Sequence, residues 1–297
     1  MSGPSPLAAP ESGAQSITSV SDTALWVAVY RAMESERPDA HFHDPYARRL
    51  AGARGEAIVR SLPQGRAMSW PMVVRTCVLD EMIGREVADG ADTVINLAAG
   101  LDTRPWRMAL PTTLRWFDVD LPVILDYKRD ILAGEAPKCR YEARAADLRD
   151  GPTRRALLAE LGAGATRALV VTEGLLIYLE AEQVAELGRD LAATPTVKTW
   201  LIDLASPALM KMMEKRHWGP HLRAGNAPFR FAPEEGTAFF EPLGWREAEY
   251  RSIWEEAARL KREMSGAWLW RFLGQFAPAS QKAAWKRFSG VVRLARA

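Results

Sequence analysis

Short apolar runs alternate with longer segments of helical periodicity through the middle of the chain. The apolar runs lie at 93–99 (TVINLAA), at 114–120 (LRWFDVD), within 138–148, at the start of 168–179 and at 196–205. Each run is short enough to be a strand buried on both faces of a sheet. Helical patterns follow at 121–132, 152–161 and 180–193. This alternation predicts an α/β fold with a doubly wound, mostly parallel sheet.

Two further strands are expected near the C-terminus, which brings the sheet to seven strands. They lie at 246–254 (REAEYRSIW) and 289–297 (SGVVRLARA), and a glycine-containing pair of residues marks the start of each strand. We expect the two strands to finish one edge of the sheet like a hairpin, after a helix near 233–241.

Three of the eleven tryptophans, Trp268, Trp270 and Trp285, stand among basic residues between these last two strands. Lysine and arginine side chains often lay their apolar stems along such rings. We therefore interpret this region as a packed edge of the fold rather than as a nucleic-acid face.

The N-terminal third divides into a tail and a helical region. Residues 1–17 are rich in Pro, Ser, Ala and Gly and predict a disordered tail, without the basic start and apolar core of a signal peptide. Residues 18–90 carry helical patterns, including a short helix that opens at Pro45 and closes at Gly52. We expect this region to form an N-terminal helical cap over the carboxyl ends of the strands, where such sheets bind ligands. Residues 91–297 then form the core, with a lid insertion at about 206–235.

Composition narrows the class of protein. The 297 residues carry a formal net charge of +2, too small to indicate a nucleic-acid partner or an anionic membrane. The two cysteines, Cys77 and Cys139, form no CxxC motif, so neither a disulfide scaffold nor a zinc site is predicted. His41, His43 and Asp44 lack a further clustered ligand, so no metal is expected. Since no apolar stretch has membrane-spanning length, we expect a cytoplasmic enzyme without a membrane partner.

The turn after the first strand, NLAAGLDTRPWR (96–107), holds a single glycine, Gly100, with Ala98 and Ala99 before it. Dinucleotide-binding turns carry GxGxxG because three glycines let the backbone approach a pyrophosphate. The turn therefore argues against a nicotinamide or flavin dinucleotide. S-adenosylmethionine has no pyrophosphate, so one close approach of the backbone suffices.

Acidic residues end three of the predicted strands. Asp118 and Asp120 end the second strand, and either carboxylate can accept the hydroxyl protons of an adenosine ribose. Asp147 can accept from an adenine amine while Leu148 covers the ring, although capping of the next helix explains Asp147 equally well. Glu173 follows a buried strand and needs a partner there, either a ligand ammonium or an internal cation.

One arginine is expected to point into the same region. Arg75 shares the apolar stripe of a helix predicted at 70–87, so its side chain should be drawn toward the sheet. A ligand carboxylate is a fitting bidentate partner, and an internal salt bridge to Asp102 or Glu173 is the alternative.

The expected lid carries the candidates for the acceptor side of the site. His217 and His221 are the candidate catalytic bases for a phenol acceptor, whereas a carboxylate acceptor is already ionised and requires no base. Arg223 and Arg230 are the candidates for holding an acidic substrate.

These residues fall in blocks that resemble a known family. The blocks SVSDTALWVAVYRAMESERPDAHFHDPYARRLAG, NLAAGLDTRPWR, FDVDLPVILDYKRDIL and VTEGLLIYL resemble the leucine carboxyl methyltransferase-like family. The closer resemblance is to its bacterial branch of S-adenosylmethionine-dependent O-methyltransferases, which includes polyketide enzymes of the tetracenomycin type. The resemblance is strong from about residue 19 to 179 and looser beyond.

The resemblance implies a class I methyltransferase fold (Rossmann-like), S-adenosylmethionine as cofactor and a small-molecule methyl acceptor, for example in secondary metabolism. It also implies cofactor contacts, namely Arg75 on the methionyl carboxylate, Gly100 beside the cofactor, Asp120 or Asp118 on the ribose, Asp147 and Leu148 at the adenine, and Glu173 near the methionyl amine.

Two departures from the family bear on function. Ala98 stands where the family turn usually has its first glycine, and Val27 where phosphatase-methylating members carry a cofactor-contacting lysine. The second departure argues against a phosphatase C-terminal leucine as substrate. We therefore expect O-methylation of a carboxylate or phenol on a small molecule. A protein C-terminal carboxyl methyltransferase and a nicotinamide-dependent oxidoreductase are the alternatives.

Overall fold

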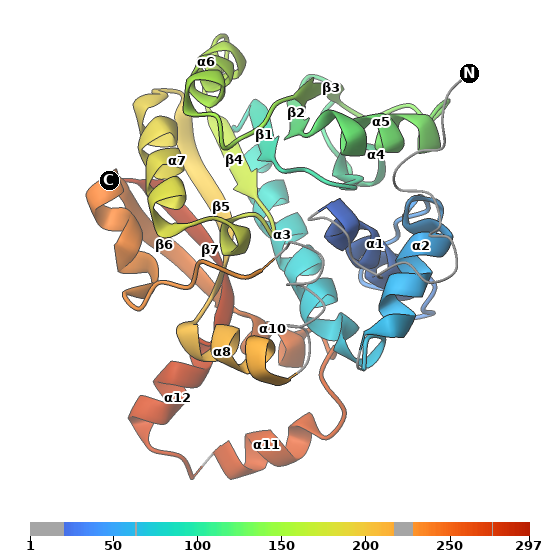
Figure 1. The fold of residues 1–297 in the computed structure, drawn as a ribbon, viewed down its shortest axis with the longest axis vertical. Helices are drawn as coiled ribbons and strands as arrows, with labels where there is room; N and C mark the ends of the chain where they lie inside the picture. The colour runs from blue at the N-terminus through green and yellow to red at the C-terminus, as the bar shows by residue number, and fades with distance from the viewer. Residues whose placement is uncertain (1–20, 63, 217–227, 275) are drawn as a thin grey trace.

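Seven strands form one sheet through the middle of the molecule (Figure 1). The computed structural model describes residues 21–62, 64–216, 228–274 and 276–297. The strands are β1 (Thr93–Leu97), β2 (Arg115–Asp120), β3 (Arg140–Ala145), β4 (Ala168–Thr172), β5 (Val197–Ala205), β6 (Trp245–Ser252) and β7 (Ser289–Arg296). Their order is β3-β2-β1-β4-β5-β7-β6, with β1 to β5 parallel and β7 antiparallel to both neighbours. The predicted doubly wound, mostly parallel seven-stranded sheet is confirmed.

Helices cover both faces of the sheet. On one face α3 (Trp70–Ala88) and α10 (Ile253–Arg259) pack on strand residues that include Val94 and Val291. On the other face α6 (Gly151–Gly162), α7 (Ala181–Ala193) and the 3₁₀ helix η3 (Gly236–Leu243) enclose strand residues that include Trp200. Further short helices are η1 (Ala67–Ser69), α4 (Arg104–Arg107), α5 (Pro122–Ile131), η2 (Leu176–Tyr178) and α8 (Pro207–Arg216). Because neighbouring strand positions face opposite layers, β1, β2, β4, β5 and β7 each contribute to both cores.

The N-terminal helices α1 (Ser21–Ser35) and α2 (Ala47–Ser61) pack on each other and bury Leu25, Val29 and Leu50 between them. The third helix, α3, packs on the sheet itself. The division of the chain at residue 90 and the lid boundaries stay predictions, and the tail at 1–17 lies outside the described residues.

Two local predictions were wrong, whereas the helix expected near 233–241 is present as the 3₁₀ helix η3. The helix that should close at Gly52 kinks there and continues to Ser61, because Gly52 adopts a φ of +56° that lets the chain turn and resume the helix. The last two strands are adjacent and antiparallel but are not joined by a tight turn, since the helices α10, α11 (Ala267–Gly274) and α12 (Ala279–Lys286) lie between them in the chain.

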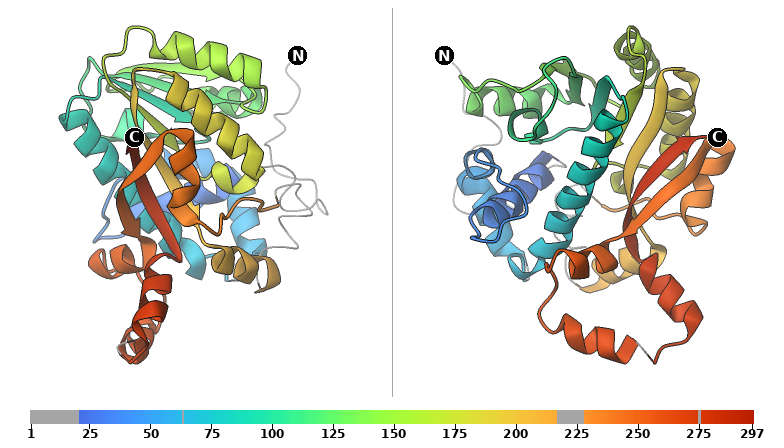
Figure 2. Two further views of the ribbon diagram at one scale, coloured as in Figure 1. Left: turned by 90° about the vertical axis from the view of Figure 1, so that its left-hand side faces the viewer. Right: turned by 180° about the vertical axis from the view of Figure 1, so that it is seen from behind.

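The prediction that the three tryptophans lie in a packed edge of the fold was also wrong. Helices α11 and α12 project from the rest of the molecule (Figure 2), and we call this segment, residues 264–274 and 276–288, the helical arm. Trp268 is 69% exposed, Trp270 57% and Trp285 38%. Basic residues alone do not bury a ring, and although the ring of Trp285 lies against Gly274 of α11, all three rings remain exposed. Within the described residues, no helix combines the length and apolar character needed to cross a bilayer.

Candidate active site

A cavity of about 250 Å³ lies at the carboxyl ends of β1, β2, β4 and β5. Its lining includes Asp120 after β2, Glu173 after β4 and Asp203 in β5, and residues of α1 and α3 complete the wall. Its volume is close to the lower end of the range of roughly 300–1,000 Å³ that is typical of small-molecule sites. This is the edge at which doubly wound sheets bind ligands.

The turn after β1 follows the cavity wall with two residues in the left-handed region. The φ angle is +54° at Ala98 and +53° at Gly100. The backbone N–H groups of Gly100 and Leu121 donate to the two carboxylate oxygens of Asp120, each at 2.7 Å. Burial raises the pKa of the Asp120 carboxyl, and these two hydrogen bonds oppose the rise. A Cβ on Gly100 would lie 3.2 Å from the Ala24 Cβ of α1, so the backbone of the turn also lies close to α1.

Asp118 has a different environment from Asp120, although the two acids are only two residues apart in the chain. Its carboxylate is fully buried and accepts from Lys128 Nζ at 2.5 Å, Trp116 Nε1 at 2.8 Å and Asn96 Nδ2 at 3.2 Å. It is not one of the cavity-lining residues. Of the two acids that the sequence left open, Asp120 is therefore the one within reach of a ligand in the cavity.

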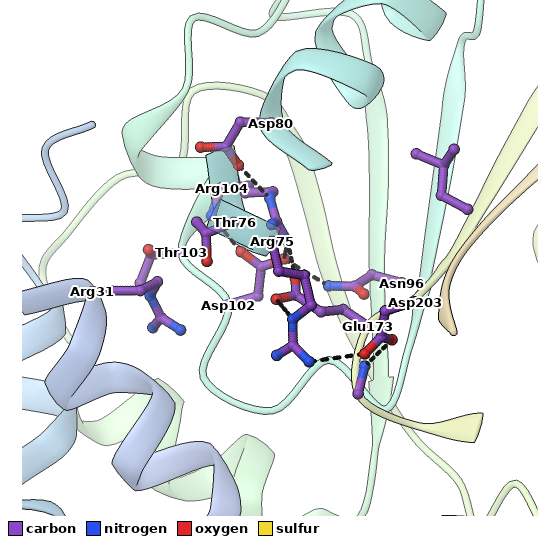
Figure 3. A network of polar contacts seen from close by, with 12 residues as sticks. Arg31, Arg75, Thr76, Asp80, Asn96, Asp102, Thr103, Arg104, Glu173 and Asp203 are labelled. Carbon is purple, nitrogen blue, oxygen red and sulfur yellow. Dashed lines mark hydrogen bonds and ion pairs between the residues drawn. The ribbon is translucent and has the colours of Figure 1, made fainter. Parts of the chain in front are cut away.

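Carboxylates and guanidiniums form a connected network beside the cavity (Figure 3). At its centre Arg104, which is 2% exposed, contacts Asp80 at 2.7 Å, Asp102 at 2.7 Å and Glu173 at 2.9 Å. Arg107 pairs with Asp80 at 2.6 Å. Burial opposes ionisation of Asp102, but the neighbouring positive charges outweigh it and hold the pKa of this carboxyl below its usual range.

Arg75 extends this network from α3 to β5. Its Nε donates to Glu173 at 3.0 Å and its Nη1 to Asp203 at 2.9 Å. Asp203 also accepts from the backbone N–H of Gly174 at 2.7 Å. Burial opposes ionisation of Glu173, but Arg104 and Arg75 outweigh it, so the pKa of Glu173 lies below its usual range. The network joins four carboxylates to three guanidiniums. Asp80 does not line the cavity whereas Arg31 does, so the lining residues carry four charges of each sign. These paired charges suit a ligand group that is itself zwitterionic.

The rest of the cavity wall is largely apolar. It includes Trp26 and Val27 of α1, Met72 of α3, and Phe229. No histidine is found among the lining residues that belong to the described ranges. Tyr178 also lines the cavity, and burial raises the pKa of its hydroxyl to about 12, so it stays protonated near neutral pH.

The structure brings together one part of the predicted site. Arg75, Ala98, Gly100, Asp120 and Glu173 all line the same cavity. The ion pair between Arg75 and Glu173, which was the alternative to ligand binding, is present. Their cofactor contacts stay predictions, since an ion pair inside the cavity and a role toward a ligand do not exclude each other.

Other predicted residues lie elsewhere. Asp147 and Leu148 are not among the lining residues, and Asp147 pairs instead with Arg149 at 2.7 Å. Arg230 is exposed and its guanidinium pairs with Glu180, outside the cavity lining. The remaining candidates, His217, His221 and Arg223, fall outside the described residues.

Sequence reasoning missed Asp203, Lys128 and the central place of Arg104. Asp203 lies near the end of β5, so the same strand-end rule that identified Asp120 would have found it. Lys128 carried no such signal, because its partner Asp118 becomes evident only when α5 is packed on β2.

Comparison with known proteins identifies the family. A family model described as leucine carboxyl methyltransferase matches residues 24–192, more than half of the chain. The chain belongs to this family. The matched residues contain most of α1, the turn after β1 and the strand ends that carry Asp120 and Glu173.

Individual relatives agree with this assignment. A relative from Mycobacterium tuberculosis, provisionally named an S-adenosyl-L-methionine-dependent methyltransferase, is 37% identical over 178 residues, which cover 55% of this chain and 59% of that relative. The chain thus aligns with less than two thirds of that relative. A relative from Saccharopolyspora erythraea with the same provisional name is 33% identical over 264 residues, 84% of this chain and 91% of the relative.

A solved structure shows the same fold. The crystal structure of a protein from Thermobifida fusca, provisionally named a methyltransferase, superposes on this structure with a TM-score of 0.55. The two sequences are 14% identical. The similarity covers 95% of this chain and 96% of the other. The class I methyltransferase fold predicted from the sequence is confirmed.

The relatives confirm S-adenosylmethionine as the predicted cofactor. The cavity of this family member fits that molecule in two respects. Its charged groups of both signs suit the zwitterionic methionyl end, and the oriented carboxylate of Asp120 beside the close turn at Gly100 suits a ribose. Neither the family match nor these relatives favour a nicotinamide-dependent oxidoreductase.

Proposed function

We propose that this family member is an S-adenosylmethionine-dependent methyltransferase that methylates an oxygen of a carboxylate, or of an acidic phenol, on a small apolar molecule. The observation that carries the proposal is the composition of one cavity. A network of carboxylates and guanidiniums at the strand ends suits the charged methionyl end of the cofactor, and an apolar wall beside it suits a hydrophobic acceptor. The names of the relatives support the methyl transfer.

The residues around the cavity have distinct roles in this proposal. Asp120 accepts hydrogen bonds from the ribose hydroxyls, and the N–H of Gly100 holds its carboxylate in place. Arg75 pairs with the methionyl carboxylate, and Glu173 with the methionyl ammonium. Ala98 keeps the turn against the cofactor.

When bound, S-adenosylmethionine supplies an electrophilic methyl group on a positively charged sulfur for in-line transfer to the acceptor oxygen. Trp26, Met72 and Phe229 exclude water and orient the acceptor beside that methyl group.

The described lining favours a carboxylate acceptor over a phenol. A carboxylate is ionised at neutral pH, so its methylation requires no general base. Tyr178 remains protonated there and can donate a hydrogen bond but not accept a proton. His217 and His221 remain the candidate bases for a phenol acceptor, and Arg223 and Arg230 remain candidates for substrate binding.

The cofactor part of the proposal is tested by calorimetric titration of the full chain with S-adenosylmethionine and S-adenosylhomocysteine. We expect Asp120→Asn to raise both dissociation constants about 10- to 100-fold, because it removes a charged acceptor from the ribose site. Asp126→Asn is the matched control, since Asp126 is an exposed acid of α5 that pairs with Arg129. Equal affinities for the two variants would contradict the assignment of Asp120, and binding of NADH instead would contradict the cofactor.

The acceptor is tested with S-adenosylmethionine labelled in the methyl group and a panel of apolar carboxylic acids and phenols. Methyl esters release labelled methanol in mild base, whereas aryl methyl ethers keep the label. Base-labile product from the acids would support the carboxylate. Base-stable product from the phenols alone would replace it with the phenol, and transfer only to protein C-termini would contradict the small-molecule proposal.

A further inference from the structure

The helical arm exposes large apolar side chains over a broad face of α11. Trp268, Leu269, Trp270, Phe272 and Leu273 are all exposed in a helix of eight residues. Since successive residues advance by roughly 100° about the axis of a helix, these five side chains span an arc of roughly 200°, while Ala267 on the remaining side is buried. A helix with so broad an apolar face normally buries it, but here the five side chains are left between 45% and 69% exposed.

The charges of the arm all have one sign. Residues 264–288 contain two lysines, two arginines and neither aspartate nor glutamate. Lys286 and Arg287 lie at the base of the arm and pair with Glu255 at 2.8 Å and Glu247 at 2.5 Å on the body of the protein. The arm beyond this base therefore combines aromatic rings with positive charge and carries no carboxylate that would repel an anionic surface.

The arm is attached beside the cavity. Ile253, where α10 begins, and Ser289, where β7 begins, both line the cavity, and the arm lies between these two positions in the chain. Figures 1 and 2 show α11 and α12 extending away from the sheet on the side of α8 and α10. Whatever binds the arm is therefore held close to the site of the reaction.

We propose that the helical arm binds the surface of a membrane that contains anionic phospholipids, with α11 lying in the interfacial region. Tryptophan is enriched at that depth because its ring is apolar and its N–H is polar. Lipid surrounds an inserted helix on its buried side and along its flanks, which suits an apolar face as broad as that of α11. Lysine and arginine near the surface add attraction to anionic headgroups.

The length of α11 excludes a different mode of membrane contact. Eight residues extend about 12 Å, far less than the hydrocarbon core of roughly 30 Å. The sequence predicted no membrane partner because it lacks a spanning segment. Attachment to the surface needs no such segment and is compatible with that observation.

A second copy of the chain is the competing occupant. Trp268 and Trp270 point roughly 160° apart about the helix axis, so a flat protein surface that covered one ring would leave the other in water, unless the arms of two copies wrapped around each other. The absence of carboxylates in the arm also gives a second arm nothing to pair with electrostatically, since both would be basic. Both observations favour lipid.

The experiment is flotation of the full chain with vesicles of phosphatidylcholine and with vesicles that also contain phosphatidylglycerol. We expect binding to the anionic vesicles, at least about tenfold weaker in the variant Trp268→Ser/Trp270→Ser, which removes two large apolar side chains. Val123→Ser is the matched control, because Val123 is an exposed apolar residue on α5, away from the arm (Figure 1). Phe276→Ser, a 75% exposed residue between α11 and α12, replaces the double variant if that one does not fold.

Four outcomes decide the proposal. Anionic-vesicle binding that Val123→Ser retains and the arm variants lose, with S-adenosylmethionine affinity unchanged, supports it. No flotation with either lipid overturns it, and so does a concentration-dependent dimer in light scattering that the arm variants alone abolish. Equal binding to neutral and anionic vesicles overturns the role of charge. None of these results depends on catalytic activity, so failure here is distinct from failure of the methyltransferase proposal.

Discussion

Replacement of Ala98 by glycine should stabilise the protein. Ala98 has a φ of +54°, a conformation that costs a residue with a Cβ about 1–2 kcal/mol. Glycine avoids that cost but loses about 0.5–1 kcal/mol through its greater freedom in the unfolded chain. The balance predicts that Ala98→Gly raises the free energy of unfolding by about 0.5–1 kcal/mol. For a chain of this size, that corresponds to a rise in Tm of about 1–3 °C.

The neighbouring alanine provides the control. Ala99 is buried and is not among the positive-φ residues, so Ala99→Gly gains nothing from relief of strain and should lower the free energy of unfolding. Urea unfolding followed by circular dichroism measures both variants. If Ala98→Gly were destabilised as much as Ala99→Gly, the strain at Ala98 would not exist and the reasoning would fail. Titration with S-adenosylmethionine would show in addition whether the methyl group of Ala98 limits cofactor affinity.

Three further outcomes are expected. Lys128→Met should lower the free energy of unfolding by about 3–5 kcal/mol because it leaves Asp118 buried without its cation, and adding Asp118→Asn should recover part of the loss. The pKa of Asp102 is lower in the folded than in the unfolded chain, so its contribution to stability is complete above about pH 4 and is lost as the pH falls further. Urea midpoints measured from pH 7 to 3 should therefore decrease in that window, and a flat profile would refute the linkage. Gly290→Ala should lower the Tm, since its Cβ would lie 2.3 Å from Cζ of Tyr250, and an unchanged Tm would mean that the ring moves freely.

Much of the sheet could be predicted from the sequence because a buried parallel strand is a local pattern. The run at 93–99 contains β1, and the strand-end rule pointed to Asp120. The same pattern could not separate Asp118 from Asp120, because residues two apart share a face of an isolated strand. Only the packing of α5 shows that Lys128 neutralises one of them and leaves the other for the cavity.

The arm was misjudged for a related reason. The sequence around Trp268 shows rings next to basic residues, but whether a ring is buried depends on which distant element covers it. No local pattern carries that information. The kink at Gly52 is similar, since a glycine that ends a helix and one that bends it have the same sequence signal.

The ion network around Arg104 makes the site insensitive to the salt content of the medium. Salt screens charges in water but hardly reaches pairs as deeply buried as Arg104 with Asp102. S-adenosylmethionine should therefore bind with nearly the same affinity in dilute and concentrated buffer. Attraction between the basic arm and a charged bilayer acts through solvent and weakens as salt rises. Ionic strength would then separate the two processes, releasing the protein from the bilayer while leaving its cofactor site intact.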